Sequence, residues 1–181
     1  KFAIPKPEDL NKGMLERLDT IERAMKVCGG PEGKRLLILS CDTGDGHNTA
    51  ANAIQEAWTA SGGYSVMVDA MHLVGPETQK RVKNSYFYLA MKAPRVFGRL
   101  YRTGNLWSKK LSKYIPSPVY ALNIVLAKQI YKYLQIRSFD AVICTQLFPM
   151  LSLTNLVRNN LLEIPSFAVF TDYACYPFMV E

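Results

Sequence analysis

The 181-residue chain lacks several features that mark common classes of protein. No apolar run approaches the roughly 18 residues needed to cross a bilayer, so no transmembrane helix is expected. The four cysteines are widely separated and form no C-x-x-C pair, which is typical of reduced structural thiols in a cytosolic protein. Repeats and low-complexity segments are also absent. The hydrophobic content of 49% favours one globular domain with a substantial core.

Acidic residues are missing from a long central region. Between Glu77 and Asp140 the chain has thirteen basic residues and no acidic one, although its net charge is only +7. This imbalance is too large for an ordinary solvated face, and aromatic residues are interleaved with the basic ones. Nucleic acid and an anionic membrane are both suitable partners for such a composition.

We expect the membrane rather than nucleic acid to be the partner of this region. No RNA-recognition signature occurs in it, whereas Trp and Tyr settle at the headgroup level of bilayers and Lys and Arg are attracted to anionic lipid. The residues expected to bind the membrane are Arg95, Phe97, Arg99, Tyr101, Arg102, Trp107, Lys109, Lys110 and Lys113.

Short apolar runs alternate with helical patterns along the chain. Strands are predicted at 35–40, 64–69, 139–145 and 166–171, and helices at 47–60, 78–91 and 118–136 and from about Pro149 onward. This alternation predicts an α/β fold with a doubly wound, Rossmann-like parallel sheet and a basic helical insertion between the second and third of these strands. We expect residues 1–30 to be a leading helix and linker, and residues 31–181 to be the domain.

The first strand is followed by a glycine loop and a helix that is predicted to start at His47. Glycines let backbone amides approach a ligand, and a helix N-terminus attracts anions. Histidine adds a group that takes up a proton near neutral pH, so the loop is suited to catalysis as well as binding. The residues expected to contact substrate or phosphate here are Thr43, Gly44, Asp45 and Gly46.

The glycine loop after the first strand also resembles a dinucleotide-binding loop. A dinucleotide-binding loop reads G-x-G-x-x-G with an acidic residue about 20 positions later. Asp69 lies at a suitable distance, but Thr49 replaces the third glycine. A nucleotide-binding module with Asp69 on a ribose therefore stays open as an alternative. His72 is expected to be structural or solvated, and no metal site is expected.

Four sequence blocks resemble the amino-terminal domain of the monogalactosyldiacylglycerol synthase family. The first is S-x-D-T-G-x-G-H-x-x-A-A-x-A-I at 40–54, and the others lie at 92–101, 140–149 and 164–173. The resemblance departs at Gln146 and Tyr176, where many members carry histidine, so roles of those histidines do not carry over.

The resemblance implies half of a two-domain GT-B glycosyltransferase that moves a hexose from a UDP-sugar to diacylglycerol. His47 is then the catalytic base, Asp172 orients it, and Thr171 and Tyr173 line the acceptor site. The donor-binding carboxyl-terminal domain is expected to lie outside this chain, which alone is expected to be inactive. The resemblance implies UDP-sugar as the co-substrate and no cofactor. The protein is expected to be cytoplasmic and bound peripherally to the membrane surface. A non-catalytic anionic-lipid-binding domain is a further alternative.

Overall fold

The computed structural model describes residues 12–42, 45–77, 80–81, 84, 88, 92, 95, 99 and 118–171. In chain order the elements are α1 (Lys12–Arg23), β1 (Lys26–Cys28), β2 (Arg35–Ser40), α2 (Asp45–Ala60), β3 (Tyr64–Asp69), the 3₁₀ helix η2 (Ala70–Val74), α5 (Pro118–Ile136), β4 (Ala141–Cys144), α6 (Leu147–Arg158) and β5 (Ser166–Ala168).

The strands form one five-stranded sheet in the order β1-β3-β2-β4-β5. β2 pairs in parallel with both β3 and β4, and β4 pairs in parallel with β5. The predicted Rossmann-like α/β fold is confirmed, with one correction. The sheet is not wholly parallel, because β1 runs antiparallel to β3. The chain moves outward from β2 in both directions, so the carboxyl edge between β2 and β4 is the switch point where such sheets bind ligands.

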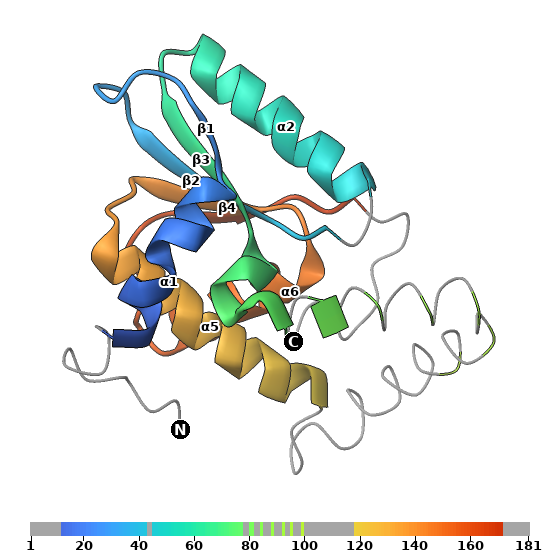
Figure 1. The fold of residues 1–181 in the computed structure, drawn as a ribbon. Coiled ribbons are helices and arrows are strands. Elements are labelled where there is room, and N and C mark those ends of the chain that lie inside the picture. Colours follow the sequence, from blue (N-terminus) through green and yellow to red (C-terminus); the bar gives the residue numbers. More distant parts are fainter. Residues whose placement is uncertain are drawn as a thin grey trace.

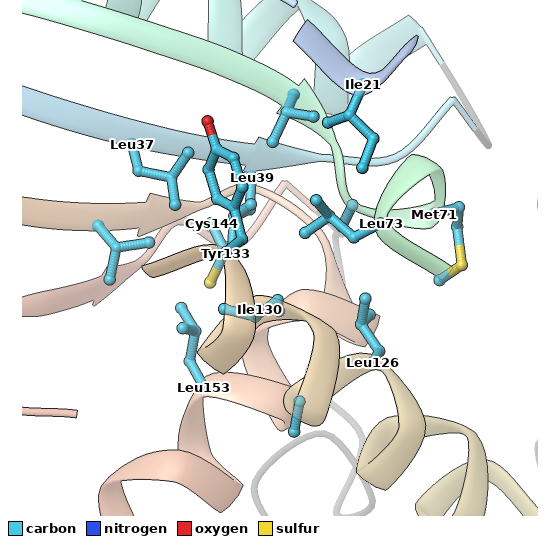
Figure 2. Packing of buried hydrophobic residues seen from close by; sticks show 14 of the residues in the cluster. Ile21, Leu37, Leu39, Met71, Leu73, Leu126, Ile130, Tyr133, Cys144 and Leu153 are labelled. Atoms are coloured by element: carbon cyan, nitrogen blue, oxygen red, sulfur yellow. The ribbon is translucent and has the colours of Figure 1, made fainter. Parts of the chain in front are cut away.

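Each face of the sheet is covered by different helices. Successive side chains of a strand point to opposite faces, so Leu37 and Leu39 enter the larger core cluster while Leu36 and Ile38 enter the smaller one. The smaller cluster includes Ala51 of α2, and the larger one draws on α1, η2, α5 and α6. Figure 1 shows α2 on one face and α1, α5 and α6 on the other. Figure 2 shows side chains of the larger cluster converging from these elements.

The leading helix belongs to this core. Met14, Leu18 and Ile21 follow a helical spacing and are 1%, 8% and 3% exposed in the larger cluster. The helical pattern in the sequence extends to residue 27, but α1 ends at Arg23 and Lys26–Cys28 form β1, which the sequence pattern did not reveal. Residues 12–28 therefore add a helix and a strand to the same core and sheet.

The other predicted elements agree closely with the structure. β2, β3 and α5 have the predicted bounds, whereas α2 starts at Asp45, ahead of His47. β4 and β5 are shorter than predicted, and α6 starts two residues before Pro149. Most of the predicted helix at 78–91 lies outside the described residues. Within the described part of the chain, no helix is both long and apolar enough to span a bilayer.

Candidate functional site

His47 lies in the first turn of α2, at the carboxyl edge of the sheet. Its Nδ1 atom is 2.9 Å from the carbonyl oxygen of Thr145, just beyond β4. The same nitrogen is 2.5 Å from Oγ1 of Thr171, three residues beyond β5. The imidazole thus joins the helix N-terminus to the segments that follow two neighbouring strands.

The contact with the Thr145 carbonyl assigns the ring proton to Nδ1. A carbonyl oxygen can only accept a hydrogen bond, so Nδ1 must be the donor to Thr145. In the neutral ring Nε2 then holds the lone pair and can take a proton from a substrate hydroxyl. The Thr171 hydroxyl lies beside the same N–H and restricts rotation of the ring.

The backbone that carries the Thr145 carbonyl is held firmly. Thr145 is 1% exposed, and its N–H donates to the carbonyl of Leu39 at 3.1 Å. On the other side, the N–H of Val169 donates to the carbonyl of Cys144 at 2.8 Å. The acceptor of the His47 proton is therefore fixed by hydrogen bonds to the strands on both sides.

Two cysteines are buried near this edge but are unsuited to nucleophilic chemistry. Burial raises the pKa of the Cys144 thiol to about 12, and burial with the nearby Asp69 charge raises the pKa of Cys41 well above its usual value. Both remain neutral thiols near pH 7, and the thiolate is the reactive form. Their expected structural role agrees with this burial.

The glycine loop is described only in part. Thr43 and Gly44 lie outside the described residues, and Asp45 is exposed at the start of α2. A Cβ atom at Gly46 would meet nothing within 4 Å, so the space beside this backbone is open. Thr49, which replaces the third glycine of a dinucleotide loop, donates its hydroxyl to the Asp45 carbonyl at 2.8 Å.

Of the site residues predicted near β5, only Thr171 is described. It was expected as a wall residue, and the structure adds a contact with His47. Asp172 and Tyr173 lie outside the described residues, so their predicted roles stay predictions. Sequence reasoning missed Thr145 as a site residue, because it contributes a backbone carbonyl; its place at the carboxyl end of β4 was the available signal.

Gln146 occupies a position where many members of the resembling family carry histidine. Its side-chain oxygen accepts a hydrogen bond from the N–H of Phe148 at 2.7 Å, and the residue is 7% exposed. Gln146 is thus the N-cap of α6. Its side-chain oxygen is engaged in starting this helix.

Asp69 lies at the end of β3, where a dinucleotide-binding domain would place its ribose-binding acid. One carboxylate oxygen accepts from the N–H of Met71 at 2.8 Å and the other from the N–H of Asp42 at 3.3 Å. Asp69 therefore caps η2 and ties it to the loop after β2. Among the described side chains, no group of three or more His, Cys, Asp or Glu could hold a metal ion.

The basic region is described at scattered positions up to residue 99 and again from residue 118. The five basic residues described between 80 and 99 are all exposed: Lys80, Arg81, Lys92, Arg95 and Arg99. Lys128 and Lys132 on α5 and Arg137 just after it are half-buried. The other residues predicted to bind the membrane lie outside the described part: Phe97, Tyr101, Arg102, Trp107, Lys109, Lys110 and Lys113.

Comparison with known families gives one match. Residues 47–181, about three quarters of the chain, match the family model described as monogalactosyldiacylglycerol (MGDG) synthase. The matched segment begins at His47 and includes both threonines that contact its ring. No curated protein and no solved structure matches the chain.

Proposed function

Because the chain belongs to the MGDG synthase family, we propose that it forms the acceptor-side part of an enzyme that transfers a hexose from a UDP-sugar to diacylglycerol. Membership already implies a glycosyltransferase acting on a diacylglycerol-like lipid. The observation that supports the finer proposal is the 2.9 Å contact between His47 Nδ1 and the Thr145 carbonyl oxygen. With Nδ1 as the donor to this carbonyl, Nε2 is left as the proton acceptor.

In the proposed reaction, His47 Nε2 takes the proton of the diacylglycerol hydroxyl. The hydroxyl oxygen forms a bond to the anomeric carbon of the sugar as the bond from that carbon to UDP breaks, and UDP leaves with the electron pair. The ring becomes an imidazolium, which strengthens its hydrogen bond to the Thr145 carbonyl. Asp172 follows Thr171 in sequence and would balance the charge of this imidazolium.

We propose that backbone amides at the start of α2 stabilise the negative charge on the departing UDP. The start of α2 carries the positive end of the helix dipole, and the open space at Gly46 leaves room for a ligand beside it. Thr43, Gly44 and Asp45 would complete this binding loop, and Tyr173 would line the acceptor site. The proposal requires UDP-sugar as co-substrate and no bound metal or cofactor.

A variant of His47 tests the catalytic proposal in the complete protein that contains these residues. His47→Ala should lower kcat by about 10²–10⁴-fold, the usual contribution of a general base, with a smaller effect on UDP-sugar binding. Glu56→Ala, an exposed change on the same helix, is the matched control. Near-parental turnover by folded His47→Ala would remove His47 from the mechanism.

The division between domains has its own test. We propose that this chain, with α1 and β1 as part of its core and sheet, serves the acceptor while a second domain binds the donor, as in GT-B enzymes. The 181-residue chain alone should then show no turnover, and robust turnover would contradict this arrangement. Failure of the complete protein to turn over any UDP-hexose would favour the non-catalytic lipid-binding alternative.

We further propose that the basic region docks the protein on the cytoplasmic surface of an anionic membrane. The support is the lack of acidic residues from 78 to 139 and the exposure of every basic residue described between 80 and 99. Each engaged charge contributes about 1 kcal/mol, so neutralising Arg95, Arg99 and Lys109 together should weaken binding to anionic vesicles by roughly 10²-fold.

The control for this experiment changes the charge by the same amount elsewhere. Arg23, Lys34 and Arg158 are exposed outside the basic region, and neutralising them should have a much smaller effect. Vesicle sedimentation with neutral and anionic lipid gives the measurement. Equal binding to both lipids, or tighter binding to single-stranded RNA, would contradict the membrane assignment.

A further inference from the structure

A polar cavity lies at the same edge of the sheet as His47, on the β3 side of β2. Its volume is about 340 Å³, and its walls come from the α1–β1 connection, the ends of β2 and β3, the first turns of α2, and η2. His47, in contrast, makes its contacts on the β4 and β5 side. Nothing in the proposed transfer reaction uses this cavity.

The charges that line the cavity favour a neutral ligand. The carboxylates of Asp42 and Asp69 oppose an anion, whereas the ammonium group of Lys26 opposes a cation. Both oxygens of Asp69 already accept hydrogen bonds from main-chain amides. The main role of this carboxylate is therefore to stabilise the loop and η2 rather than to bind a ligand. The remaining lining is dense in neutral hydrogen-bonding groups.

The hydrogen bonds of two asparagines show which of their atoms remain for a ligand. Asn48 and Asn52 are four residues apart and share one face of α2. The side-chain oxygen of Asn48 accepts from the Ser40 hydroxyl at 2.7 Å, and that of Asn52 accepts from Lys26 Nζ at 2.7 Å. Their amino groups are therefore the donors that can serve a ligand.

His72 of η2 adds a further polar group to the lining of the cavity. Its Nδ1 atom is buried, and within the described part of the chain it has no hydrogen-bond partner. Buried polar atoms are normally paired, so the unpaired Nδ1 sets His72 apart from an ordinary structural histidine, while the exposed part of its ring is what lines the cavity. Met67 contributes apolar surface to the same cavity.

We propose that this cavity binds the hydroxyl groups of a neutral hexose in the headgroup of a glycolipid. Hydroxyls both donate and accept, which suits a wall of amides, an imidazole and an ammonium group, and Met67 can cover the C–H face of the ring. The volume lies near the lower end of the range for small-molecule sites, which fits one ring. The choice of a hexose among polyols rests on the proposed transferase function, because the product of that reaction carries one.

Direct binding to the 181-residue chain tests this site without any turnover. Methyl β-galactoside and methyl β-glucoside are titrated into ¹⁵N-labelled protein, with glycerol and NAD as comparison ligands because a ribose also presents neighbouring hydroxyls. We expect a hexoside to shift the side-chain amide signals of Asn48 and Asn52, with a Kd of about 1 mM, tighter than that of glycerol or NAD.

Variants assign the binding to the cavity. Asn52→Leu and His72→Leu should each weaken hexoside binding by about tenfold, since each removes a hydrogen-bonding group. His72→Gln should restore part of the affinity because it keeps a polar group there. Gln135→Leu, an exposed change on α5, should have no effect. If Asn52→Leu does not fold, the two His72 variants carry the comparison.

Three results would overturn the proposal: no localised shift with either hexoside, tighter binding of NAD than of a hexoside, or equal loss of affinity in His72→Leu and His72→Gln. Hexoside binding in a protein that fails the transferase assay would sustain this site while refuting the proposed reaction. Sugar transfer by a protein that binds neither hexoside would support the proposed reaction and refute this binding site.

Discussion

Replacing Thr171 by valine removes one of the two groups that hold the ring of His47. Valine matches threonine in shape but has no hydroxyl, so the 2.5 Å contact with Nδ1 is lost while the Thr145 carbonyl at 2.9 Å remains. A hydrogen bond to a neutral group contributes about 0.5–1.5 kcal/mol, and one to a charged group about 1.5–3 kcal/mol. Because the ring gains charge in the proposed transition state, the upper range applies.

These magnitudes predict a fall in kcat of about 10- to 10²-fold for Thr171→Val in the complete protein. The loss should be smaller than that of His47→Ala, since the base itself is still present. The KM for UDP-sugar should change little, because a positioning residue acts through the ring rather than on the donor. Thr171→Ser keeps the hydroxyl and should retain most of the activity.

The assay measures initial rates with UDP-sugar and diacylglycerol in mixed vesicles, and thermal unfolding of each variant is recorded alongside. Parental kcat in Thr171→Val would refute the positioning role. Equal losses in Thr171→Val and Thr171→Ser, with unchanged stability, would also refute it, because the hydroxyl would then not be the active feature.

Two further predictions concern stability. Gln146→Ala removes the N-cap of α6 and should lower the unfolding free energy by about 1 kcal/mol, which corresponds to a fall of roughly 2–4 °C in Tm. Gln146→Asp keeps a capping oxygen and should retain most of the stability. Equal loss of stability in both variants would rule out capping. Burial raises the pKa values of Cys41 and Cys144 in the folded state, so the unfolded chain loses these thiol protons at a lower pH than the folded protein does. Stability should therefore fall as pH rises from about 9 toward 12. Cys144→Ala should reduce this slope, and an unchanged slope would contradict the assignment. At pH 8, a thiol reagent should modify the half-buried Cys28 quickly but Cys41 and Cys144 only on unfolding.

The sequence predicted those elements whose pattern is long or strongly apolar. β2 contains the apolar run 36–39, β3 contains the apolar run 66–68, and the Ser117-Pro118 start of α5 is a local signal, so the bounds of these three elements were predicted correctly. β1 has three residues, of which two are exposed, and it is held by backbone pairing with β3. Such a strand has no periodicity from which it could be predicted.

The candidate site was only partly predictable for a similar reason. His47 stood out because a glycine loop and a helix start surround it. The Thr145 carbonyl could not be predicted, because every residue type has a backbone carbonyl and the position of this one depends on pairing between β2 and β4. The cavity beside His72 combines side chains from elements far apart in sequence, so no local pattern indicates it.

Asp69 decides between the transferase proposal and the dinucleotide-binding alternative. It occupies the position of a ribose-binding acid, which is why that alternative arose from the sequence. Its two oxygens instead accept the amides of Met71 and Asp42, and Thr49 stands where the third glycine would be. A cavity of about 340 Å³ also fits one sugar ring better than a dinucleotide. We therefore expect NAD to leave Tm unchanged, because a ligand stabilises a protein only by binding its folded state, and a rise in Tm with NAD concentration would reinstate the dinucleotide interpretation.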